Sequence, residues 1–149
     1  MSALHPTPAR LGLLGEVAQG RVFRDAAGAD YVSGGRRVSA QLAEMERARW
    51  VALPDGQGLR TWQITHLGTA HRMIRILNYG THAVAEIGPD DTPEVIGEAR
   101  RRSETGRGSW WVQVGQGEAV CRTGSAALAE LRRRAADLVA AQLAEAVTT

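Results

Sequence analysis

The amino-acid sequence predicts a mixed α+β protein in two parts, about residues 6–77 and about residues 78–149. Three observations support this division. Between Arg36 and Ile64 the spacing of apolar residues changes from three and four, as on one helix face, to two, as in strands. The run Asn78-Tyr79-Gly80 then interrupts the pattern, as a junction between domains does. Apolar residues recur at helical spacing from Ala126 to about Ala146, which predicts a long helix at the end of the second part.

The composition indicates a folded protein without a membrane span. A chain of 149 residues forms one ordinary domain or two small ones, and 44% apolar residues suffice for a packed core. The apolar runs are only a few residues long, and the N-terminus lacks the apolar stretch of a secretory signal. The single cysteine, Cys121, has no partner for an internal disulfide, and zinc-ligand spacing is absent. We therefore expect a cytoplasmic protein without a metal or cofactor.

The charges are unevenly distributed along the chain. All 18 basic residues are arginines, a bias that a GC-rich genome produces, and the guanidinium group suits phosphates and guanine edges. Residues 1–75 hold ten arginines and six acidic residues, a net charge of +4. Residues 76–149 hold eight arginines and ten acidic residues, a net charge of −2. The positive excess in the first half favours a nucleic-acid partner there.

A helix and an ambiguous segment open the chain. Thr7 can cap a helix that continues through Pro8 and ends at Gly20, because these residue types suit the N-cap, the first turn and the end. The segment from Arg21 to Gly35 has apolar pairs on both sides of a small-residue turn, which favours two strands. The same segment also permits one short helical turn between Ala26 and Tyr31, so both interpretations stay open.

The stretch from Arg36 to Ile64 predicts a helix followed directly by a two-stranded hairpin. The helix is expected to run from Arg36 to Trp50, and its apolar face consists of Val38, Leu42 and Met45. The turn residues Pro54-Asp55-Gly56 separate two strands, WVAL and LRTWQI. We expect Trp50 and Trp62 to lie across this hairpin from each other and to pack into the core.

A third helix is predicted from Thr65 to about Leu77, and with it the N-terminal part resembles a known family. The segment MERARWV, from Met45 to Val51, leads into the turn, and ITHLGTAHR, from Ile64 to Arg72, leads out of it. Arg10 to Arg75 therefore resembles the winged helix-turn-helix domain of bacterial regulators, of the MarR/PadR type. Two features depart from that family. The segment before the second helix does not read as a helix, and Arg49 stands where glycine is usual.

The resemblance implies sequence-specific binding of double-stranded DNA by a homodimer. Arginine pairs with guanine and glutamine with adenine in the major groove, and a basic residue on the wing suits the DNA backbone. An ordinary solvated helix face is the alternative. The candidate DNA-binding residues are Arg36, Arg37, Ser39, Ala40, Gln41 and Arg47 on the helix and Arg60 on the wing, and Arg10 can assist.

The second part predicts a small β-α-β-β-α module. His82 to Ile87 alternates like a strand, and Thr92 with Pro93 can open a helix that continues to about Arg102. Two strands, WWVQV from Trp110 and EAVCR from Glu118, form a hairpin through the glycine turn between them. Ser125 can then cap the long last helix.

The second part also carries the candidate surfaces for self-association or ligand binding. Trp110 and Trp111 are adjacent on one strand, so their side chains point to opposite faces of the sheet. One of them can belong to the core, and the other must be covered by a second element or a partner. The last helix can pack on its own sheet or form a dimer seam. The residues considered for a dimer or ligand contact are Trp111, Leu128, Leu131 and Leu138.

The function expected from the sequence is DNA binding by a dimeric transcriptional regulator or a mobile-element replication or maintenance factor. The second part could add a small ligand or a protein partner. The alternative is a protein-interaction adaptor built on the same scaffold without DNA binding. An enzyme is not expected, since His66 and His71 are not on one helical face and no phosphate-loop pattern is present.

Overall fold

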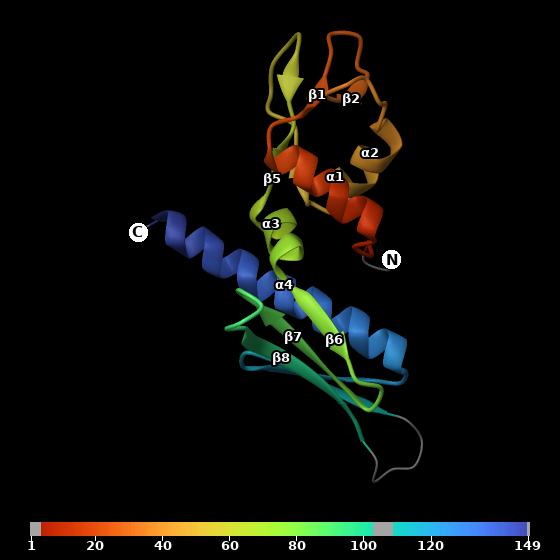
Figure 1. Cartoon of the computed structure of the whole chain (residues 1–149), viewed down its shortest axis with the longest axis vertical. Helices are drawn as coiled ribbons and strands as arrows, with labels where there is room; N and C mark the ends of the chain where they lie inside the picture. The colour runs from red at the N-terminus through yellow and green to blue at the C-terminus, as the bar shows by residue number, and fades with distance from the viewer. Residues whose placement is uncertain (1–3, 103–108, 149) are drawn as a thin grey trace. The chain divides into compact units, whose positions relative to one another are not determined.

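The computed structural model describes residues 4–102 and 109–148 of the chain (Figure 1). It confirms the mixed α+β class, with helices and antiparallel sheets. The chain separates into two compact units, unit 1 from Met1 to Arg72 and unit 2 from Met73 to Thr149. This boundary lies before the junction expected at residues 77–78, because a strand begins where the third helix was expected to continue.

Helix α1, Pro8–Ala18, begins and ends as the sequence predicts. The hydroxyl oxygen of Thr7 accepts a hydrogen bond from the backbone N–H of Arg10 at 3.3 Å, which satisfies one of the free donors at the helix start. Gly20, whose φ of 73° suits glycine, follows the end of the helix. Its buried face consists of Leu13, Leu14 and Val17.

The segment from Arg21 to Gly35, for which the sequence permitted two strands or a helical turn, forms a β-hairpin. Strand β1, Val22–Arg24, pairs antiparallel with β2, Asp30–Val32. The Asp25 carboxylate organises the turn between them by accepting hydrogen bonds from the N–H groups of Ala27 and Ala29, both at 3.0 Å. The hairpin therefore occupies the place of the second helix of a helix-turn-helix, and we identify no winged helix as such in the fold.

Helix α2, Ser39–Arg47, is shorter than the predicted helix from Arg36 to Trp50. At its start, the backbone of Arg36 accepts a hydrogen bond from Val32 at 2.9 Å, and Arg37 forms a bridge to Tyr31. These two arginines therefore extend the β1–β2 hairpin instead of the helix. At its end, Arg49 takes a left-handed conformation with φ of 66°, which no α-helix continues.

The expected second strand of the next hairpin is divided between two sheets. Strand β3, Val51–Ala52, pairs with β5, Gln63–Ile64, whereas β4, Arg60–Thr61, pairs with β1. The residue between β4 and β5 is Trp62, and its backbone N–H donates to the carbonyl of Val22 at 2.9 Å. The register places Val51 opposite Ile64, so the expected position of Trp50 across from Trp62 is wrong.

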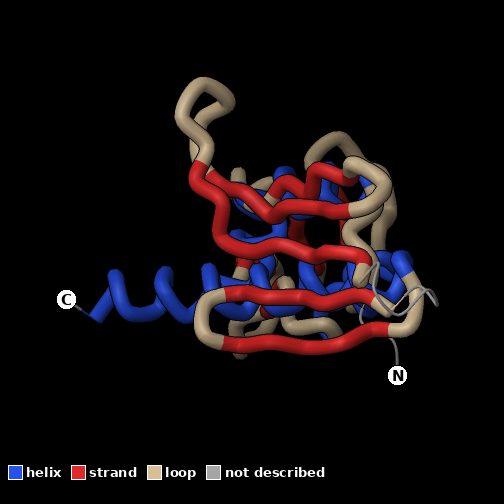
Figure 2. Tube along the Cα trace, turned by 90° about the horizontal axis from the view of Figure 1, so that it is seen from below, coloured by secondary structure: helices blue, strands red, loops and turns tan. Residues whose placement is uncertain are grey.

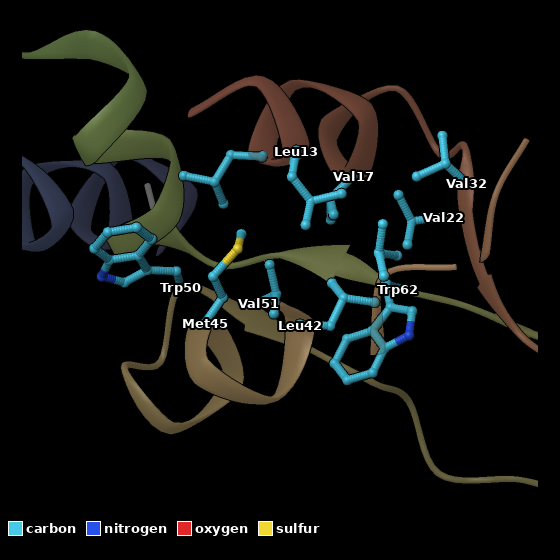
Figure 3. Packing of buried hydrophobic residues seen from close by; sticks show 11 residues of the cluster. Leu13, Val17, Val22, Val32, Leu42, Met45, Trp50, Val51 and Trp62 are labelled. Carbon is cyan, nitrogen blue, oxygen red and sulfur yellow. The ribbon is translucent and has the colours of Figure 1, made fainter. Parts of the chain in front are cut away.

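Helix α3, His66–Met73, follows and is capped by Thr65 as predicted, but it does not reach Leu77. The core of unit 1 lies between α1, α2 and the strands, and both tryptophans are buried in it as expected (Figure 3). Its residues are Leu13, Leu14, Val17, Val22, Val32, Val38, Leu42, Met45, Trp50, Val51 and Trp62.

Unit 2 consists of five antiparallel strands followed by one long helix. The strands are β6, Arg75–Asn78; β7, His82–Ile87; β8, Glu94–Arg101; β9, Trp110–Val114; and β10, Gly117–Cys121. They pair in the order β10-β9-β8-β7-β6, so each strand neighbours the next one in the sequence. Helix α4, Gly124–Thr148, covers one face of this sheet and extends beyond it (Figure 2).

The predicted helix from Thr92 to Arg102 is wrong, because β8 occupies this segment. Its inward residues are Gly97 and Ala99, both buried, so the alternation consists of small residues and was not visible as an apolar pattern. A Cβ atom at Gly97 would lie 2.6 Å from the Val114 side chain and 3.1 Å from that of Leu131. Glycine therefore lets α4 approach the sheet closely. None of the helices in the described parts of the chain is long and apolar enough to cross a membrane.

Two helical glycines of unit 1, Gly68 in α3 and Gly12 in α1, provide a matched test of how closely α3 packs. A Cβ atom at Gly68 would collide with the carbonyl oxygen of Trp50 and lie 2.8 Å from the Ile64 side chain, whereas one at Gly12 meets nothing within 4 Å. We expect Gly68→Ala to lower the free energy of unfolding by about 1–3 kcal/mol through overpacking. Gly12→Ala should raise it by about 0.5–1 kcal/mol. Denaturant unfolding of both variants checks this, and equal effects would contradict the packing around α3.

Candidate nucleic-acid interface

The outward side of α2 carries two alanines and one arginine. Leu42 and Met45 are buried, and the positions opposite them on a helix of 3.6 residues per turn are Ala40, Ala43 and Arg47, all exposed. Gln41, also exposed, lies on one flank of this side. Small residues at the centre allow the helix backbone to approach a groove, and longer polar residues at the edges can reach base edges.

Two arginines precede the helix and are both exposed. Arg36 and Arg37 lie on the extension of the β1–β2 hairpin, directly before the first turn of α2. The guanidinium carbon of Arg37 lies 5.7 Å from the centre of the Tyr31 ring, which is a cation–π contact. This contact leaves the N–H groups of Arg37 available for other partners. Neither arginine forms an ion pair within residues 4–102 and 109–148.

One of the two carboxylates on α2, that of Glu44, and the hydroxyl group of Ser39 already have partners. Glu44 forms an ion pair with Arg10 at 3.1 Å, which neutralises a negative charge beside the outward side of α2. Arg10, named as an assisting residue, is therefore committed to this contact. The Ser39 hydroxyl oxygen accepts a hydrogen bond from the Asp30 backbone N–H at 3.2 Å, although the residue as a whole is exposed.

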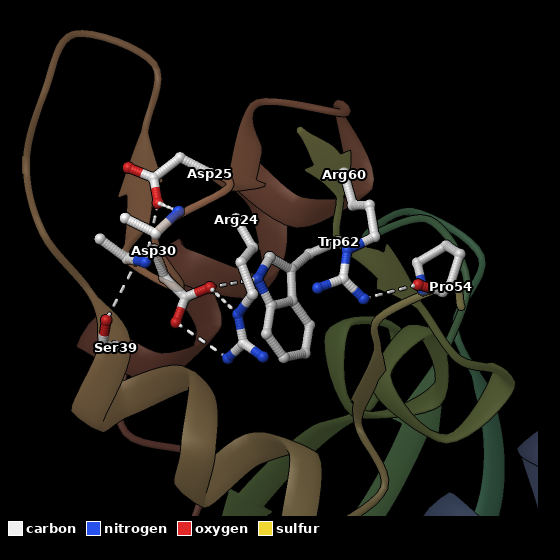
Figure 4. Close-up of polar contacts among 9 residues, drawn as sticks. Arg24, Asp25, Asp30, Ser39, Pro54, Arg60 and Trp62 are labelled. Atoms are coloured by element: carbon white, nitrogen blue, oxygen red, sulfur yellow. Dashed lines mark hydrogen bonds and ion pairs between the residues drawn. The ribbon is translucent and has the colours of Figure 1, made fainter. Parts of the chain in front are cut away.

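Arg60 lies at the base of the hairpin loop and not at its tip. Its Nη1 donates to the Pro54 carbonyl at 3.2 Å, and its side chain is half-buried (Figure 4). This bond spans the loop and joins both of its ends. Part of the guanidinium group is therefore held by the protein, and only the remainder can meet a phosphate.

Beneath this surface lies one buried carboxylate, that of Asp30, which is 1% exposed. It accepts two hydrogen bonds from Arg24, at 3.0 and 3.2 Å, and one from the indole N–H of Trp62 at 2.8 Å (Figure 4). The Arg24 guanidinium carbon also lies 5.2 Å from the centre of the Trp62 ring. Together with the contact to Ser39, Asp30 joins β1, β2, the start of α2 and the junction of β4 with β5.

The protonation state of Asp30 follows from these contacts. Burial by itself would raise the pKa of the carboxyl group, but the hydrogen bonds from Arg24 and Trp62 and the positive charge of Arg24 outweigh it. The pKa of Asp30 is therefore lowered from its ordinary value, and the pKa of Arg24 is raised, mainly by its hydrogen bond to Asp30. The pair is ionised across the neutral pH range.

The candidates in unit 2 lie in different environments. Trp110 is buried with Val112 and Val114 on the helix side of β9, whereas Trp111 is half-buried on the opposite face. Leu131 is fully buried against the sheet, which leaves it no surface for a second molecule, and Leu128 and Leu138 are half-buried. Burial raises the pKa of the free Cys121 thiol. No group of three or more possible metal ligands occurs among the described residues.

Sequence reasoning missed two residues of this region. Asp30 was not singled out, because only the hairpin brings Arg24 six residues back to it and Trp62 is distant in the sequence. Arg49 was noted only as a departure from the family. The one signal for its conformation was the expectation of glycine at that position, and Arg49 is the only non-glycine residue with positive φ in the described segments.

Replacement of the buried carboxylate provides a stability test. Asp30→Asn removes the negative charge that pairs with Arg24, and we expect the free energy of unfolding at pH 7 to fall by about 2–3 kcal/mol. The pKa of Asp30 is lower in the folded state, so its contribution is fully present above the unfolded pKa of about 3.9 and is lost as the pH falls toward the lower folded value.

Chemical unfolding between pH 3 and pH 7 measures both effects. Wild type should lose more stability than Asp30→Asn on acidification, so the two curves converge at low pH. The control is Asp55→Asn, at an exposed turn residue, which should leave the curve unchanged. An equal difference between wild type and Asp30→Asn at every pH would contradict the lowered pKa.

Comparison with known proteins gives no family and no function for the chain. No known protein family, curated protein or solved structure matches the chain. The function must therefore be argued from the surface that α2, the two preceding arginines and the hairpin form.

Proposed function

We propose that unit 1 binds double-stranded DNA in the manner of a winged helix, with α2 in the major groove and the β3–β5 hairpin on the backbone. The observation that carries this proposal is the outward side of α2. Ala40, Ala43 and Arg47 lie on this side, and Arg36 and Arg37 precede it; the three arginines are exposed and without ion pairs in the described residues. The N-terminal end of a recognition helix is the part that contacts base edges in this mode of binding.

The charge of unit 1 supports this partner. Residues 1–72 contain nine arginines and six acidic residues, a net charge of +3. Arg10, Arg21 and Arg24 form ion pairs inside the unit. The other six arginines form none in the described residues, so the positive charge is concentrated on side chains that can reach phosphates. These six are Arg36, Arg37, Arg47, Arg49, Arg60 and Arg72.

The β1–β2 hairpin replaces the helix that positions the recognition helix in the family that the sequence resembles. Its contribution here is different: the Asp30 contacts and the bridge between Tyr31 and Arg37 fix the start of α2. We propose that the protein acts as a homodimer in transcriptional control or in the replication or maintenance of a mobile element. Two copies would read two half-sites, as symmetric DNA-binding proteins do.

The two arginines before α2 are the sharpest test. The double variant Arg36→Ala/Arg37→Ala should weaken binding to a duplex selected from a random pool by about ten- to a hundredfold, and it should accept altered sequences more readily. Fluorescence anisotropy over a salt series measures this, with a shallower salt dependence expected for the variant.

The matched control is Arg21→Ala, which removes an exposed arginine that pairs with Glu16 at 3.2 Å. It should bind nearly as wild type does. If wild type binds no duplex at low salt, or without steep salt dependence, the DNA proposal is excluded and the protein-interaction adaptor remains. Equal binding by the double variant and wild type would place the DNA on another surface.

Arg49 offers a test that separates stability from binding. A left-handed conformation costs an arginine about 1 kcal/mol relative to glycine, and this side chain is exposed without an ion pair in the described residues. If it contacts a phosphate beside α2, Arg49→Gly should raise the free energy of unfolding by about 1 kcal/mol and still weaken duplex binding. Arg49→Ala should weaken binding equally without the gain in stability. Unchanged binding in both variants would remove Arg49 from the interface.

A further inference from the structure

One face of the five-stranded sheet is not covered by α4. The helix packs against Ala83, Ala85, Ala99, Val112 and the other inward residues, and Figure 2 shows it behind the strands. The alternate residues of the same strands therefore form the open face. Several of these residues are exposed, and the open face carries aromatic side chains next to charged ones.

The strand register aligns four of these residues in one row across neighbouring strands. His82 is opposite Arg100, Arg100 is opposite Trp111, and Trp111 is opposite Val120. Directly opposite residues of antiparallel strands share one face, so an imidazole, a guanidinium and an indole group lie side by side. Two strand spacings of about 4.8 Å separate the first from the third, which gives a row of about 10 Å.

The aromatic part of the row continues into the turn before β7. The Tyr79 ring, in the β6–β7 turn, stacks on the His82 ring with centroids 4.9 Å apart and an angle of 20° between the planes. Tyr79 is 58% exposed, so its ring is accessible to a ligand. The stacked pair presents its outer ring face to solvent.

The charges of unit 2 are separated between the two ends of the sheet. The end of the open face that holds the row also holds Arg100, Arg102 and Arg122, all exposed, and of these only Arg100 pairs with a carboxylate among the described residues. Arg101, also exposed, is opposite Trp110 and therefore lies on the helix side of the same end. The opposite end holds Asp90, Asp91 and Glu94, also exposed. Residues 73–149 hold nine arginines and ten acidic residues, a net charge of −1, yet the end beside the aromatic residues is positive.

We propose that this end of the open face, formed by Tyr79, His82, Arg100 and Trp111, binds a single-stranded nucleic acid. Unpaired bases stack on aromatic side chains, and arginines beside them neutralise the phosphates. A duplex hides its bases from such a surface, so charge complementarity and exposed rings together favour the single strand. The row of about 10 Å offers two aromatic platforms, the Tyr79–His82 pair and Trp111, and one base can stack on each.

The next row of the same face sets the limit of the site. Glu98 is opposite Gln113, which is opposite Glu118, so two carboxylates repel phosphates there. Glu98 also pairs with Arg100 at 3.1 Å and competes with a phosphate for its guanidinium group. The site is therefore confined to the arginine-rich end, and Glu98 weakens the binding that it borders.

The experiment uses the full chain and fluorescein-labelled 12-nucleotide probes of dT and of rU, with anisotropy as the readout. Wild type should bind with an affinity that falls steeply with salt. Trp111→Leu and Arg100→Ala should each weaken binding about tenfold, through lost stacking and lost charge. Glu98→Gln should strengthen binding at least twofold, a gain that damage to the fold would not produce. Binding of either probe that Trp111→Leu and Arg100→Ala weaken supports the site, and a preference between the probes identifies the polymer.

The matched control is Arg133→Ala, which removes a half-exposed arginine that pairs with Glu130 and Asp137 on α4. It should bind as wild type does. The double variant Arg36→Ala/Arg37→Ala should also retain single-strand binding, which separates this site from the duplex site of unit 1. The inference is overturned if wild type binds neither probe, if Glu98→Gln does not gain, or if only the unit 1 variant loses binding.

Discussion

The buried carboxylate of Asp30 is the constraint on which unit 1 depends. A carboxylate removed from water is costly unless it is paired and hydrogen-bonded, and here it accepts two bonds from Arg24 and one from Trp62. These partners come from strands that are far apart in the sequence. The geometry that satisfies the charge is therefore available only when the hairpin, α2 and the β4–β5 junction are all in place, which ties local folding to the tertiary structure.

This arrangement explains how a hairpin can position α2 where the family that the sequence resembles has a helix. A helix before α2 would position it through apolar packing along one face. The β1–β2 hairpin instead positions it through a backbone extension at Arg36 and Arg37 and through the contact between Ser39 and Asp30. The outward side of α2 stays open in both cases, because its buried residues, Leu42 and Met45, face the same core.

The elements with strong local signals were predictable from the sequence, and those specified by small residues were not. Thr7 and Gly20 marked α1 because capping is a local effect, and WWVQV alternated visibly as a strand. Strand β8 was taken for a helix because its inward positions, Gly97 and Ala99, carry almost no apolar surface. The outward face of α2 could be predicted from spacing alone, whereas the role of Asp30 required a partner 32 residues away.

The division at Trp62 has a mechanical consequence for the β3–β5 hairpin. This residue ends one sheet and begins the other, and its indole ring is fixed in the core by both packing and a hydrogen bond. The base of the β3–β5 hairpin is therefore held by the core, whereas the residues between Ala52 and Arg60 lie outside the paired strands. A displacement of the β1–β2 hairpin would also move the β3–β5 hairpin, because Trp62 is hydrogen-bonded to Val22 of β1 and to Asp30 of β2.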